Sequence, residues 1–375
     1  MTLGTVQASI SGERRVALVP PVVSALSKKG LEVTVESNAG REAGISDDAF
    51  REAGARIVQD TEAWGSDILA LVAPPSDEEI VRLSSGAVVV GFMQPLEVPE
   101  RIARLADQGV TALAMELVPR ISRAQKMDAL SAMASLAGYK ATLIAANLLP
   151  RFFPLLTTAA GTVRPANVTI LGAGVAGLQA IATARRLGAR VWGYDIREAA
   201  REEVKSLGAQ FVELDLEMED MQDEGGYAKA LMAAKAEQQV ELLVPHLAKS
   251  DVVITTALIP GRRAPTLVSE EAIKAMKPGS IVVDLAAATG GNCVLTEPDR
   301  VTTRHGVQIV GYTNLPATVP ADASFLYART ISAMISEFVK DGVFETNFED
   351  DIFKSACVCH EGQVVHERVR NLIDR

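Results

Sequence analysis

Cysteine is scarce in this chain of 375 residues, which contains only Cys293, Cys357 and Cys359. These thiols are too few and too clustered for a disulfide framework, so we expect a reduced, cytosolic chain. Cys357, Cys359 and His360 do not have the spacing of a zinc site. We therefore expect a short strand at this place and no bound metal.

Positive charge is not in excess either. The chain has 37 Lys and Arg residues against 47 Asp and Glu residues, a net charge of −10, and no basic stripe. This balance argues against nucleic acid as a partner. The first residues, MTLGTVQASISGERRVALVP, show no signal-peptide pattern. The one long apolar stretch, Ala129–Leu149, is interrupted by Gly138, Lys140 and Asn147, which favours a buried interdomain helix over a membrane span and predicts a soluble protein.

A glycine-rich turn between a predicted strand and a predicted helix does stand out, in VTILGAGVAGLQAIATARRLGARVWGYD. Gly172, Gly174 and Gly177 fill the pattern G-x-G-x-x-G. The first glycine allows a tight turn, the second lets the backbone approach a pyrophosphate, and the third lets the helix pack closely on its strand. The start of the helix offers N–H groups to the phosphates. The stretch therefore predicts a dinucleotide site.

Asp195 ends the second strand of this stretch, where a carboxylate accepts hydrogen bonds from the hydroxyls of the adenosine ribose. Because its charge repels a 2′-phosphate, the position favours NAD over NADP. The pattern alone also fits an α/β turn that binds no nucleotide, and it does not identify the reaction.

The first part of the chain alternates apolar strands with helices that stop at glycine, which predicts a doubly wound parallel sheet. This first domain has no glycine fingerprint of its own. We expect strands over Thr5–Ile10, Leu31–Glu36, Ala55–Val58, Ile68–Val72, Val88–Phe92 and Thr111–Leu117, and helices over Pro20–Lys29, Asp47–Ala53, Asp77–Ser84 and Glu100–Asp107. A long helix from Met127 to Asn147 then leads into the second domain.

The second domain adds further strands to the glycine-rich stretch, and the chain then returns to the first domain. The strands are expected over Gln210–Leu214, Asp251–Leu258, Ser280–Leu285 and Val307–Tyr312, the returning helix over Ala321–Val339 and a closing hairpin over Ser355–Val365. The acidic segment Leu216–Met232 is either a solvated loop leading into the helix Tyr227–Glu241 or a lid.

The predicted fold class is α/β, with two doubly wound Rossmann-like domains, a cleft between them, and long helices that join them. We assign residues 1–126 and 320–375 to the first domain and residues 127–319 to the NAD(H)-binding domain.

The chemistry expected of the chain follows from its histidines and from one polar segment. None of its four histidines falls in a polar cluster where a doubly wound fold binds ligands. Transfer of hydride between two nicotinamides needs no acid or base, only groups that position the rings. Arg120, Gln125, Asp128 and Ser131 are groups of this kind, and the last two share a face at the start of a helix. The alternative is an interdomain polar network that touches no ligand.

The chain resembles the NAD(H)-binding component (domain I, the alpha-1 subunit) of proton-translocating NAD(P) transhydrogenase, in the alanine dehydrogenase/transhydrogenase superfamily. The resemblance covers almost the whole length. It rests on GERRVALVP, AMELVPRISRAQKMDALSAMASLAGYKA, TTAAGTVRPANVTILGAGVAGLQAIATARRLGA, EGGYAKAL, ITTALIPGRRAPTLVSEEAIKAMKPGSIVVDLAAATGGNC and IVGYTNLPA. The segment RISRAQKMD is the most specific of these.

The resemblance implies roles for residues on both sides of the expected cleft. Gln125 corresponds to the glutamine that positions the nicotinamide for hydride transfer, with Arg120, Asp128 and Ser131 around it. The implied cofactor-binding residues are Arg120, Ile121, Ser122, Arg123, Gln125, Asp128, Ser131, Tyr139, Gly172, Gly174, Val175, Ala176, Gly177, Asp195, Ile196, Arg197, Gly226, Tyr227 and Leu258. Among these, Gly226 and Tyr227 match a mobile loop that closes over the nucleotide, and Leu258 matches the adenine-side wall.

The resemblance also implies cofactors and partners. NAD(H) is bound by this chain and NADP(H) by a partner, no metal takes part, and the transhydrogenation is Re/Si-specific and active only with partner subunits. Because the sequence stops at Arg375 without hydrophobic spans, it resembles the separate soluble subunit. Its partners are then a second copy in a homodimer, a membrane-spanning transhydrogenase subunit and an NADP(H)-binding beta subunit. The chain is expected in the cytoplasm, peripheral on the cytoplasmic face of the inner (plasma) membrane.

Two other functions stay open. Alanine dehydrogenase is similar through ERRVALVP, the glycine turn and GRRAPTLVSEEAIKAMKPGSIVVDLA, and Arg15 is present. That enzyme needs a lysine on the fourth strand, a histidine after the fifth and an aspartate before the late Gly-Gly. This chain has LALVAPPS, VGFMQPLE and Ala288-Thr289 at the matching places. The other function is a non-catalytic module that binds NAD for regulation.

Overall fold

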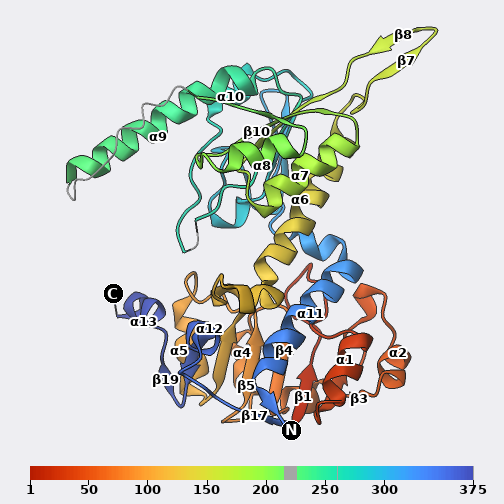
Figure 1. Cartoon of the computed structure of the whole chain (residues 1–375), viewed down its shortest axis with the longest axis vertical. Coiled ribbons are helices and arrows are strands. Elements are labelled where there is room, and N and C mark those ends of the chain that lie inside the picture. The colour runs from red at the N-terminus through yellow and green to blue at the C-terminus, as the bar shows by residue number, and fades with distance from the viewer. Residues whose placement is uncertain (215–225, 260, 375) are drawn as a thin grey trace. The chain divides into compact units, whose positions relative to one another are not determined.

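The computed structural model describes residues 1–214, 226–259 and 261–374, without the side chains of residue 60 and of residues 226–235. The chain forms two compact units (Figure 1). Unit 1 combines Met1–Met133 with Pro316–Arg375, and unit 2 is Ala134–Leu315.

Unit 1 is built on an eight-stranded sheet in the order β19-β18-β6-β5-β4-β1-β2-β3. The strands are β1 Thr2–Thr5, β2 Glu32–Glu36, β3 Arg56–Val58, β4 Ile68–Leu71, β5 Val88–Gly91, β6 Thr111–Ala114, β18 Cys357–His360 and β19 Gln363–Val364. Strands β1 to β6 run parallel, and the C-terminal hairpin β18–β19 adds two antiparallel strands at the edge. The chain winds outward from β1 to β3 and then returns to β4 on the other side of β1.

Helices cover both faces of this sheet, as the alternation of apolar strands and helical segments predicts. One face packs on α3 Asp60–Trp64, α4 Asp77–Ile80, α5 Pro99–Asp107 and α13 Glu367–Ile373. The other elements of unit 1 are α1 Pro20–Ser27, α2 Asp47–Glu52, α11 Pro320–Phe338, α12 Asp351–Ala356, the short pair β16 Val339–Lys340 and β17 Val343–Phe344, and the 3-10 helices η1 Arg41–Ala43, η2 Met115–Leu117 and η3 Ser122–Met127. The chain is back in unit 1 by Pro316, before α11 begins.

The predicted elements of unit 1 are present, but two predicted strands have the wrong bounds. The first was expected over Thr5–Ile10, yet β1 ends at Thr5. Beyond it the ladder stops, because the N–H of Gln7 donates to the Glu36 carboxylate at 2.7 Å and not to a strand carbonyl. The strand expected over Thr111–Leu117 ends at Ala114, where the chain turns into η2.

Glycines follow three helices of unit 1 as predicted, at Gly30, Gly54 and Gly109, but α4 ends at Ile80 and not at the expected Ser84, so that Gly86 lies in a later turn. Gly30, Gly54, Gly86 and Gly109 all have positive φ, between 75° and 100°. This left-handed conformation is the one that stops a helix, and glycine adopts it without steric cost.

Unit 2 holds a seven-stranded sheet in the order β11-β10-β9-β12-β13-β15-β14. Its strands are β9 Asn167–Leu171, β10 Arg190–Tyr194, β11 Gln210–Phe211, β12 Val252–Thr255, β13 Ile281–Asp284, β14 Val301–Arg304 and β15 Val307–Val310. All pairs are parallel except β14–β15, and β14 is a strand that the sequence did not predict. The chain reverses its winding direction between the neighbours β9 and β12.

Both faces of this second sheet are also covered (Figure 1). The helices of unit 2 are α6 Ala129–Leu148, which begins in unit 1, and α7 Val175–Arg186, α8 Ala200–Ser206, α9 Gly226–Leu247 and α10 Glu270–Ala275, with the 3-10 helices η4 Ala287–Thr289 and, at the return to unit 1, η5 Leu315–Thr318. One core lies between the sheet and α6, α7 and α8, and the other lies between the sheet and α9 and α10. The parallel sheets and their helices confirm the predicted Rossmann-like fold class.

Helix α6 is the one helix of the described residues that is long and apolar enough to cross a membrane, by length and composition alone. Its Ala141 and Ala145 are fully buried in the core of unit 2. The hydroxyl of Thr142 donates to the carbonyl of Ala180 in α7 at 3.3 Å. This face of α6 therefore packs as a helix of a folded core.

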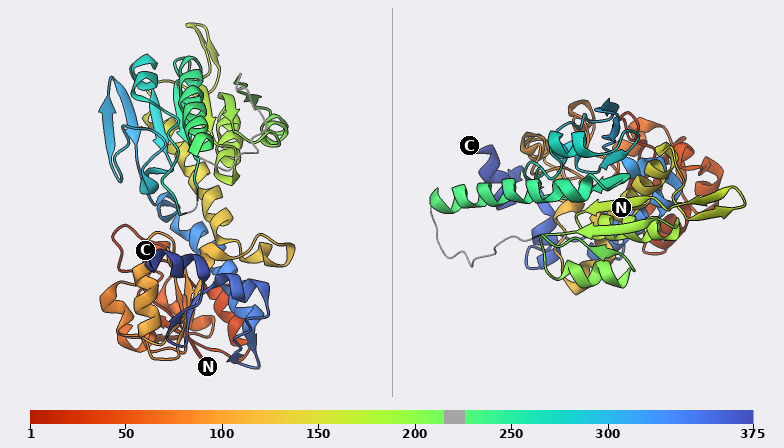
Figure 2. Two further views of the ribbon diagram at one scale, coloured as in Figure 1. Left: turned by 90° about the vertical axis from the view of Figure 1, so that its left-hand side faces the viewer. Right: turned by 90° about the horizontal axis from the view of Figure 1, so that it is seen from above.

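A hairpin absent from the sequence prediction extends from unit 2. Its strands are β7 Leu156–Thr158 and β8 Gly161–Val163, and it reaches away from the rest of the unit in all views (Figures 1 and 2). Apolar side chains in and before it are exposed, with Leu155 at 60%, Phe152 at 55% and Val163 at 39%. A hairpin of two strands is marginally stable in water, so this one presents apolar surface without a core beneath it.

The three cysteines are all buried with free thiols. Cys357 and Cys359 lie in β18, the strand predicted there. Burial raises the pKa of the Cys293 thiol to about 11 and the pKa of the Cys357 and Cys359 thiols to about 12. Within the described residues no group of three or more His, Cys, Asp or Glu side chains could hold a metal ion.

Candidate functional site

The glycine turn lies where the sheet of unit 2 changes its winding direction. It connects β9 to α7, and β9 is flanked by β10 and β12. Gly172 follows the strand with φ +98°, and Gly174 is the N-cap of α7. In open α/β sheets, ligands bind outside the carboxyl ends of the strands at this reversal.

The three glycines of the turn differ in what surrounds them. A Cβ at Gly177 would lie 1.8 Å from the carbonyl oxygen of Gly172, and a Cβ at Gly172 would lie 2.6 Å from the Thr256 hydroxyl. The packing of the chain therefore requires both. A Cβ at Gly174 would meet no atom within 4 Å. The missing side chain at Gly174 leaves backbone open to the outside, which is what a pyrophosphate needs.

The start of α7 is suited to an anion. Its N-cap provides no side-chain hydrogen bond, and the first-turn N–H groups of a helix have no acceptor within the helix. Val175 is exposed and Ala176 half-buried, so the positive end of the helix is accessible. The residues present fit a bound pyrophosphate group.

Helix α6 contacts this turn closely. A Cβ at Gly138 would lie 2.0 Å from the carbonyl oxygen of Ala176, so only glycine lets α6 approach the first turn of α7. Tyr139, the next residue, is 39% exposed. The sequence marked Gly138 only as an interruption of an apolar stretch. Its role depends on a contact between two helices that the one-dimensional pattern does not contain.

Asp195 joins the second strand to the glycine turn. Its Oδ2 accepts a hydrogen bond from the N–H of Ala173 at 2.8 Å. Its Oδ1 accepts from the N–H of Arg197 at 2.9 Å and from Nε of Arg197 at 3.0 Å, while Nη2 of Arg197 reaches Oδ2 at 3.1 Å. Burial opposes ionisation of the carboxyl, but the hydrogen bonds from Arg197 and Ala173 outweigh it and lower the pKa of Asp195. The group is a carboxylate at neutral pH.

The sequence also predicts Ile196, Arg197 and Leu258 on the adenosine side. Ile196 and Arg197 are exposed beside Asp195, and Leu258 is 54% exposed in the loop after β12. Gly226 is the first residue of α9, but the side chain of Tyr227 and residues 216–225 of the expected lid lie outside the described residues.

The polar segment Arg120–Ser131 lies in unit 1. Asp128 precedes α6 and caps it: its Oδ1 accepts from the N–H of Ser131 at 2.8 Å and its Oδ2 from the Ser131 hydroxyl at 2.6 Å. The predicted proximity of these two residues at a helix start is confirmed. Gln125 belongs to η3 and is exposed, as are Arg120, Ile121 and Ser122.

The guanidinium of Arg123 forms ion pairs with two other residues of unit 1. It pairs with Asp350 at 2.7 Å and with Glu337 at 2.9 Å. Lys126 also pairs with Glu337, at 3.0 Å. The hydrogen bond from Arg123 to Asp350 is the main cause that raises the pKa of Arg123. These pairs tie η3 to α11 and to the cap of α12.

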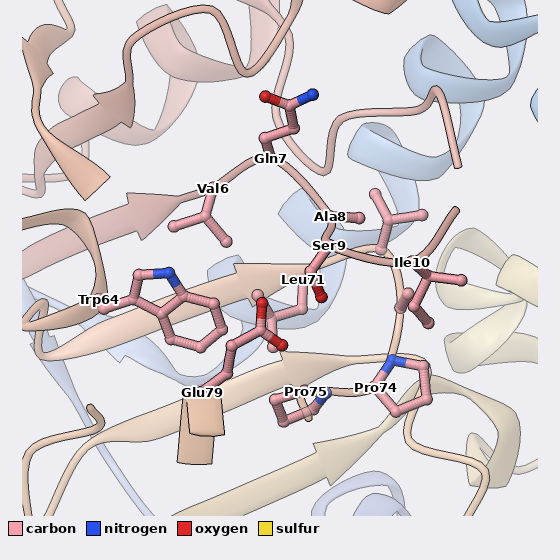
Figure 3. A pocket seen from close by; sticks show the side chains of 12 residues that line it. Val6, Gln7, Ala8, Ser9, Ile10, Trp64, Leu71, Pro74, Pro75 and Glu79 are labelled. Carbon is pink, nitrogen blue, oxygen red and sulfur yellow. The ribbon is translucent and has the colours of Figure 1, made fainter. Parts of the chain in front are cut away.

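Unit 1 reverses its winding between β1 and β4, and a hollow lies at that point (Figure 3). Figure 3 shows Val6, Trp64 and Leu71 around it, with Glu79 beside Trp64. Its cavity volume is only about 10 Å³, far below the usual size of a ligand pocket. The Glu79 carboxylate accepts from the N–H of Ser76 at 2.8 Å in a capping box. The described residues that line the hollow include no cationic side chain for an acidic substrate.

The strand ends beside this hollow are occupied by the chain itself. Tyr327 is fully buried, and its hydroxyl donates to the carbonyl of Leu71 at 2.7 Å and accepts from the N–H of Phe92 at 3.2 Å. Arg15 is buried in a pair with Glu13 at 2.6 Å. The segments LALVAPPS and VGFMQPLE, where the resemblance places the lysine and histidine of an alanine dehydrogenase, contain neither residue.

Glu116 is a half-buried acid at this edge, and the sequence pattern did not reveal it. Its Oε1 accepts from the N–H groups of Met93 and Gln94, each at 2.8 Å, and its Oε2 is buried with no hydrogen-bond partner in the described part of the chain. Burial raises the pKa of the Glu116 carboxyl to about 7. An acid near the end of a predicted strand carries no signal of this kind in the sequence.

Comparison with known proteins agrees with this geometry. Residues 6–137 match the family model "Alanine dehydrogenase/PNT, N-terminal domain" and residues 141–367 match "Alanine dehydrogenase/PNT, C-terminal domain". The NAD(P) transhydrogenase subunit alpha of Cereibacter sphaeroides is 44% identical over 370 residues, 97% of this chain and 71% of the other. A transhydrogenase alpha subunit of Rhodospirillum rubrum is 45% identical over 366 residues, 95% of each chain.

A solved structure and an alanine dehydrogenase complete the comparison. The crystal structure of a transhydrogenase from Sinorhizobium meliloti has a TM-score of 0.86 at 42% identity, over 98% of this chain and 99% of the other. The alanine dehydrogenase of Bacillus subtilis is 30% identical over 382 residues, 98% of this chain and 94% of the other. The chain therefore belongs to the alanine dehydrogenase/PNT family and is more similar to these transhydrogenases than to that alanine dehydrogenase.

Proposed function

We propose that the chain binds NAD(H) at the glycine turn of unit 2 and transfers hydride directly between NADH and NADP⁺ held by a partner subunit. In the whole complex this transfer is coupled to proton translocation across the membrane. The bound nicotinamide supplies or accepts the hydride. The residues of the chain bind NAD(H), orient its nicotinamide ring and discriminate NAD(H) from NADP(H).

The observation that carries the proposal is the open backbone at Gly174. The other two glycines of the turn are required by internal packing, whereas a side chain at Gly174 would contact nothing in the described chain. Glycine there serves a ligand better than it serves the fold. The uncapped start of α7 adds N–H donors and a positive dipole for the two phosphates.

The remaining residues receive roles consistent with their surroundings. Asp195 accepts the ribose hydroxyls and repels a 2′-phosphate, which favours NAD(H) over NADP(H). Gln125 positions the nicotinamide from an exposed place in η3, close in sequence to the bonded pair Asp128–Ser131. Arg120 neutralises phosphate charge. None of these roles requires an acid or base, because hydride passes without a proton.

The partners follow from the relatives. Transhydrogenase alpha subunits are components of multi-subunit enzymes by name, so we propose an NADP(H)-binding beta subunit and a membrane-spanning subunit as partners. The chain would then be peripheral on the cytoplasmic face of the membrane. We also propose a homodimer that covers the β7–β8 hairpin, because Leu155 and Phe152 before it are 60% and 55% exposed.

The test of the binding site uses Gly174→Ala. Gly174 has φ −75° and ψ −169°, a conformation that alanine adopts, so the variant should fold with a stability equal to wild type or slightly above it. Its methyl group should block the pyrophosphate and weaken NADH binding at least about tenfold, measured by NADH fluorescence. Gly65→Ala is the matched control, because a Cβ there meets only ordinary contacts. Equal NADH binding by Gly174→Ala and wild type would contradict the proposed site.

The test of the reaction compares two assays. The purified chain should bind NADH but reduce NADP⁺ only after the NADP(H)-binding partner is added. Turnover of pyruvate and ammonia by the purified chain would favour alanine dehydrogenase instead. NADH binding without transfer in the presence of the partner would favour a regulatory module.

A further inference from the structure

The loop after β12, described over residues 256–259 and 261–269, is held at its base by one buried side chain. Asn292 is fully buried, and its amide makes three hydrogen bonds to this loop. Its Oδ1 accepts from the N–H of Ala257 at 3.1 Å, and its Nδ2 donates to the carbonyls of Ala257 at 2.9 Å and Pro265 at 2.7 Å. The two ends of the segment that carries Leu258 are thereby held together.

The segment that contains Asn292 is itself fixed. Gly290 and Gly291 have φ +97° and +75°, and a Cβ at Gly291 would lie 2.8 Å from Oδ2 of Asp284. That oxygen accepts from the N–H of Cys293 at 3.0 Å and from the Thr296 hydroxyl at 2.7 Å. The late Gly-Gly pair therefore sets the backbone that aims Asn292 at the loop.

The same loop begins with a contact to the glycine turn. The hydroxyl of Thr256 donates to the carbonyl of Gly172 at 3.0 Å, and the N–H of Thr256 donates to the carbonyl of Leu171 at 2.8 Å. The hydroxyl lies 2.6 Å from where a Cβ of Gly172 would be, and 3.2 Å from where a Cβ of Gly177 would be. It occupies the space that the glycines leave and fixes the direction of the Gly172 peptide.

From these contacts we infer that Thr256 and Asn292 are positioning residues for the bound nucleotide. Thr256 holds the turn that receives the pyrophosphate, and Asn292 holds the loop that carries Leu258 toward the adenosine side. Both act through the backbone of other residues. The inference rests on the proposed function, because it assumes that the turn binds a pyrophosphate.

Asn292 also lies next to a place where this chain is expected to differ from an alanine dehydrogenase. By the resemblance, an alanine dehydrogenase needs an aspartate just before the late Gly-Gly, whereas this chain has Ala288-Thr289 there. The polar group that the chain uses at this place follows the glycines, at Asn292, and its partners are main-chain atoms of the loop. Its work is to hold the binding loop and not to transfer a proton.

The first experiment compares Thr256→Val with Thr256→Ser. Valine has the shape of threonine without the hydroxyl, so the hydrogen bond to Gly172 is lost and NADH affinity should fall about five- to tenfold. Serine keeps the hydroxyl and should bind NADH within about twofold of wild type. Thr183→Val is the matched control, because the Thr183 hydroxyl bonds within α7 to the carbonyl of Gln179 at 2.8 Å. The control should lose thermal stability but keep NADH affinity.

The second experiment compares Asn292→Ala with Asn167→Ala. The Asn167 amide donates to the carbonyl of Lys249 at 3.0 Å, at the start of β9 and away from the turn. Asn292→Ala should weaken binding of AMP as strongly as binding of NADH, because the loop serves the adenosine half. Asn167→Ala should change neither affinity.

The outcomes separate this inference from the proposed function. Wild-type protein that binds no NADH would overturn both. Equal NADH affinities of Thr256→Val and wild type, or a Thr256→Ser variant that fails to restore the affinity, would overturn the positioning role and leave the proposed function standing. An affinity loss in Thr183→Val as large as that in Thr256→Val would also overturn it. Should Asn292→Ala not fold, the Thr256 pair still decides.

Discussion

The guanidinium of Arg197 donates a hydrogen bond to each oxygen of the Asp195 carboxylate, from Nε to Oδ1 at 3.0 Å and from Nη2 to Oδ2 at 3.1 Å. The N–H groups of Arg197 and Ala173 bond to the same two oxygens. Asp195 thus accepts four hydrogen bonds from the protein, and a carboxylate has about four acceptor positions in all. A ribose hydroxyl can bond to Asp195 only after the guanidinium moves away.

The variant Arg197→Ala should therefore bind NADH more tightly, by up to about fivefold, because the partly exposed ion pair with Asp195 no longer has to be broken. It should also reject NADPH more strongly, since the carboxylate charge is no longer neutralised. Titrations with NADH and NADPH measure both effects, with Arg190→Ala at the opposite end of β10 as the control. Weaker NADH binding than in the control would mean that the guanidinium contacts the nucleotide.

Gln125→Asn should separate binding from transfer. The side chain is exposed in η3 and its shortening by one methylene leaves the fold intact, so NADH affinity should stay within about twofold of wild type. Misplacement of the nicotinamide by about 1 Å should lower hydride transfer about a hundredfold. Single-turnover transfer to NADP⁺ on the partner subunit measures the rate. A rate near wild type would remove Gln125 from the site.

Glu116→Gln should change how stability depends on pH. Burial raises the pKa of Glu116 from 4.5 to about 7, so the folded chain keeps a proton that the unfolded chain loses. Stability from this group is fully present below pH about 4.5 and is lost as pH rises through about 7, by about 1–3 kcal/mol. The amide stays neutral, so the variant should match wild type near pH 5 and be more stable at pH 8. If the urea midpoints of the variant and of wild type differed by the same amount at pH 5 and at pH 8, Glu116 would not be the cause of the pH dependence.

Leu155→Glu should weaken the proposed dimer. The side chain is 60% exposed beside the β7–β8 hairpin, so the charge costs the folded subunit little but is unfavourable in an apolar interface. Sedimentation of the variant should show a monomer at concentrations where wild type is a dimer. Val343→Glu, at a residue 56% exposed in β17 of unit 1, is the control and should remain dimeric.

The sequence was sufficient for the features of the site that are local. Spacing alone identified Gly172, Gly174 and Gly177 as a turn between strand and helix, and placed Asp195 at the end of the next strand. Asp128 and Ser131 could be paired because their contact spans less than one helical turn.

The features that the sequence did not predict depend on neighbours distant in the chain. Thr256 and Gly138 contact the glycine turn and α7 from other elements, and nothing in their own segments distinguishes them. The first strand was predicted with the wrong bounds because its alternating pattern continues beyond Thr5, where the hydrogen bonds to β2 and β4 end. The β7–β8 hairpin was not predicted because its strands, LTT and GTV, are three residues long with one large apolar residue each, too few for an alternating pattern.

Because its three cysteines are buried, the folded chain should not react with thiol reagents. Alkylation needs an accessible thiolate, and burial raises the pKa of the Cys293, Cys357 and Cys359 thiols to about 11, 12 and 12. A cysteine introduced by Leu155→Cys would carry the single thiol in the native protein that a fluorescent maleimide reaches. The rate at which this thiol is labelled would then show whether a second copy covers the β7–β8 hairpin, without a signal from the native cysteines.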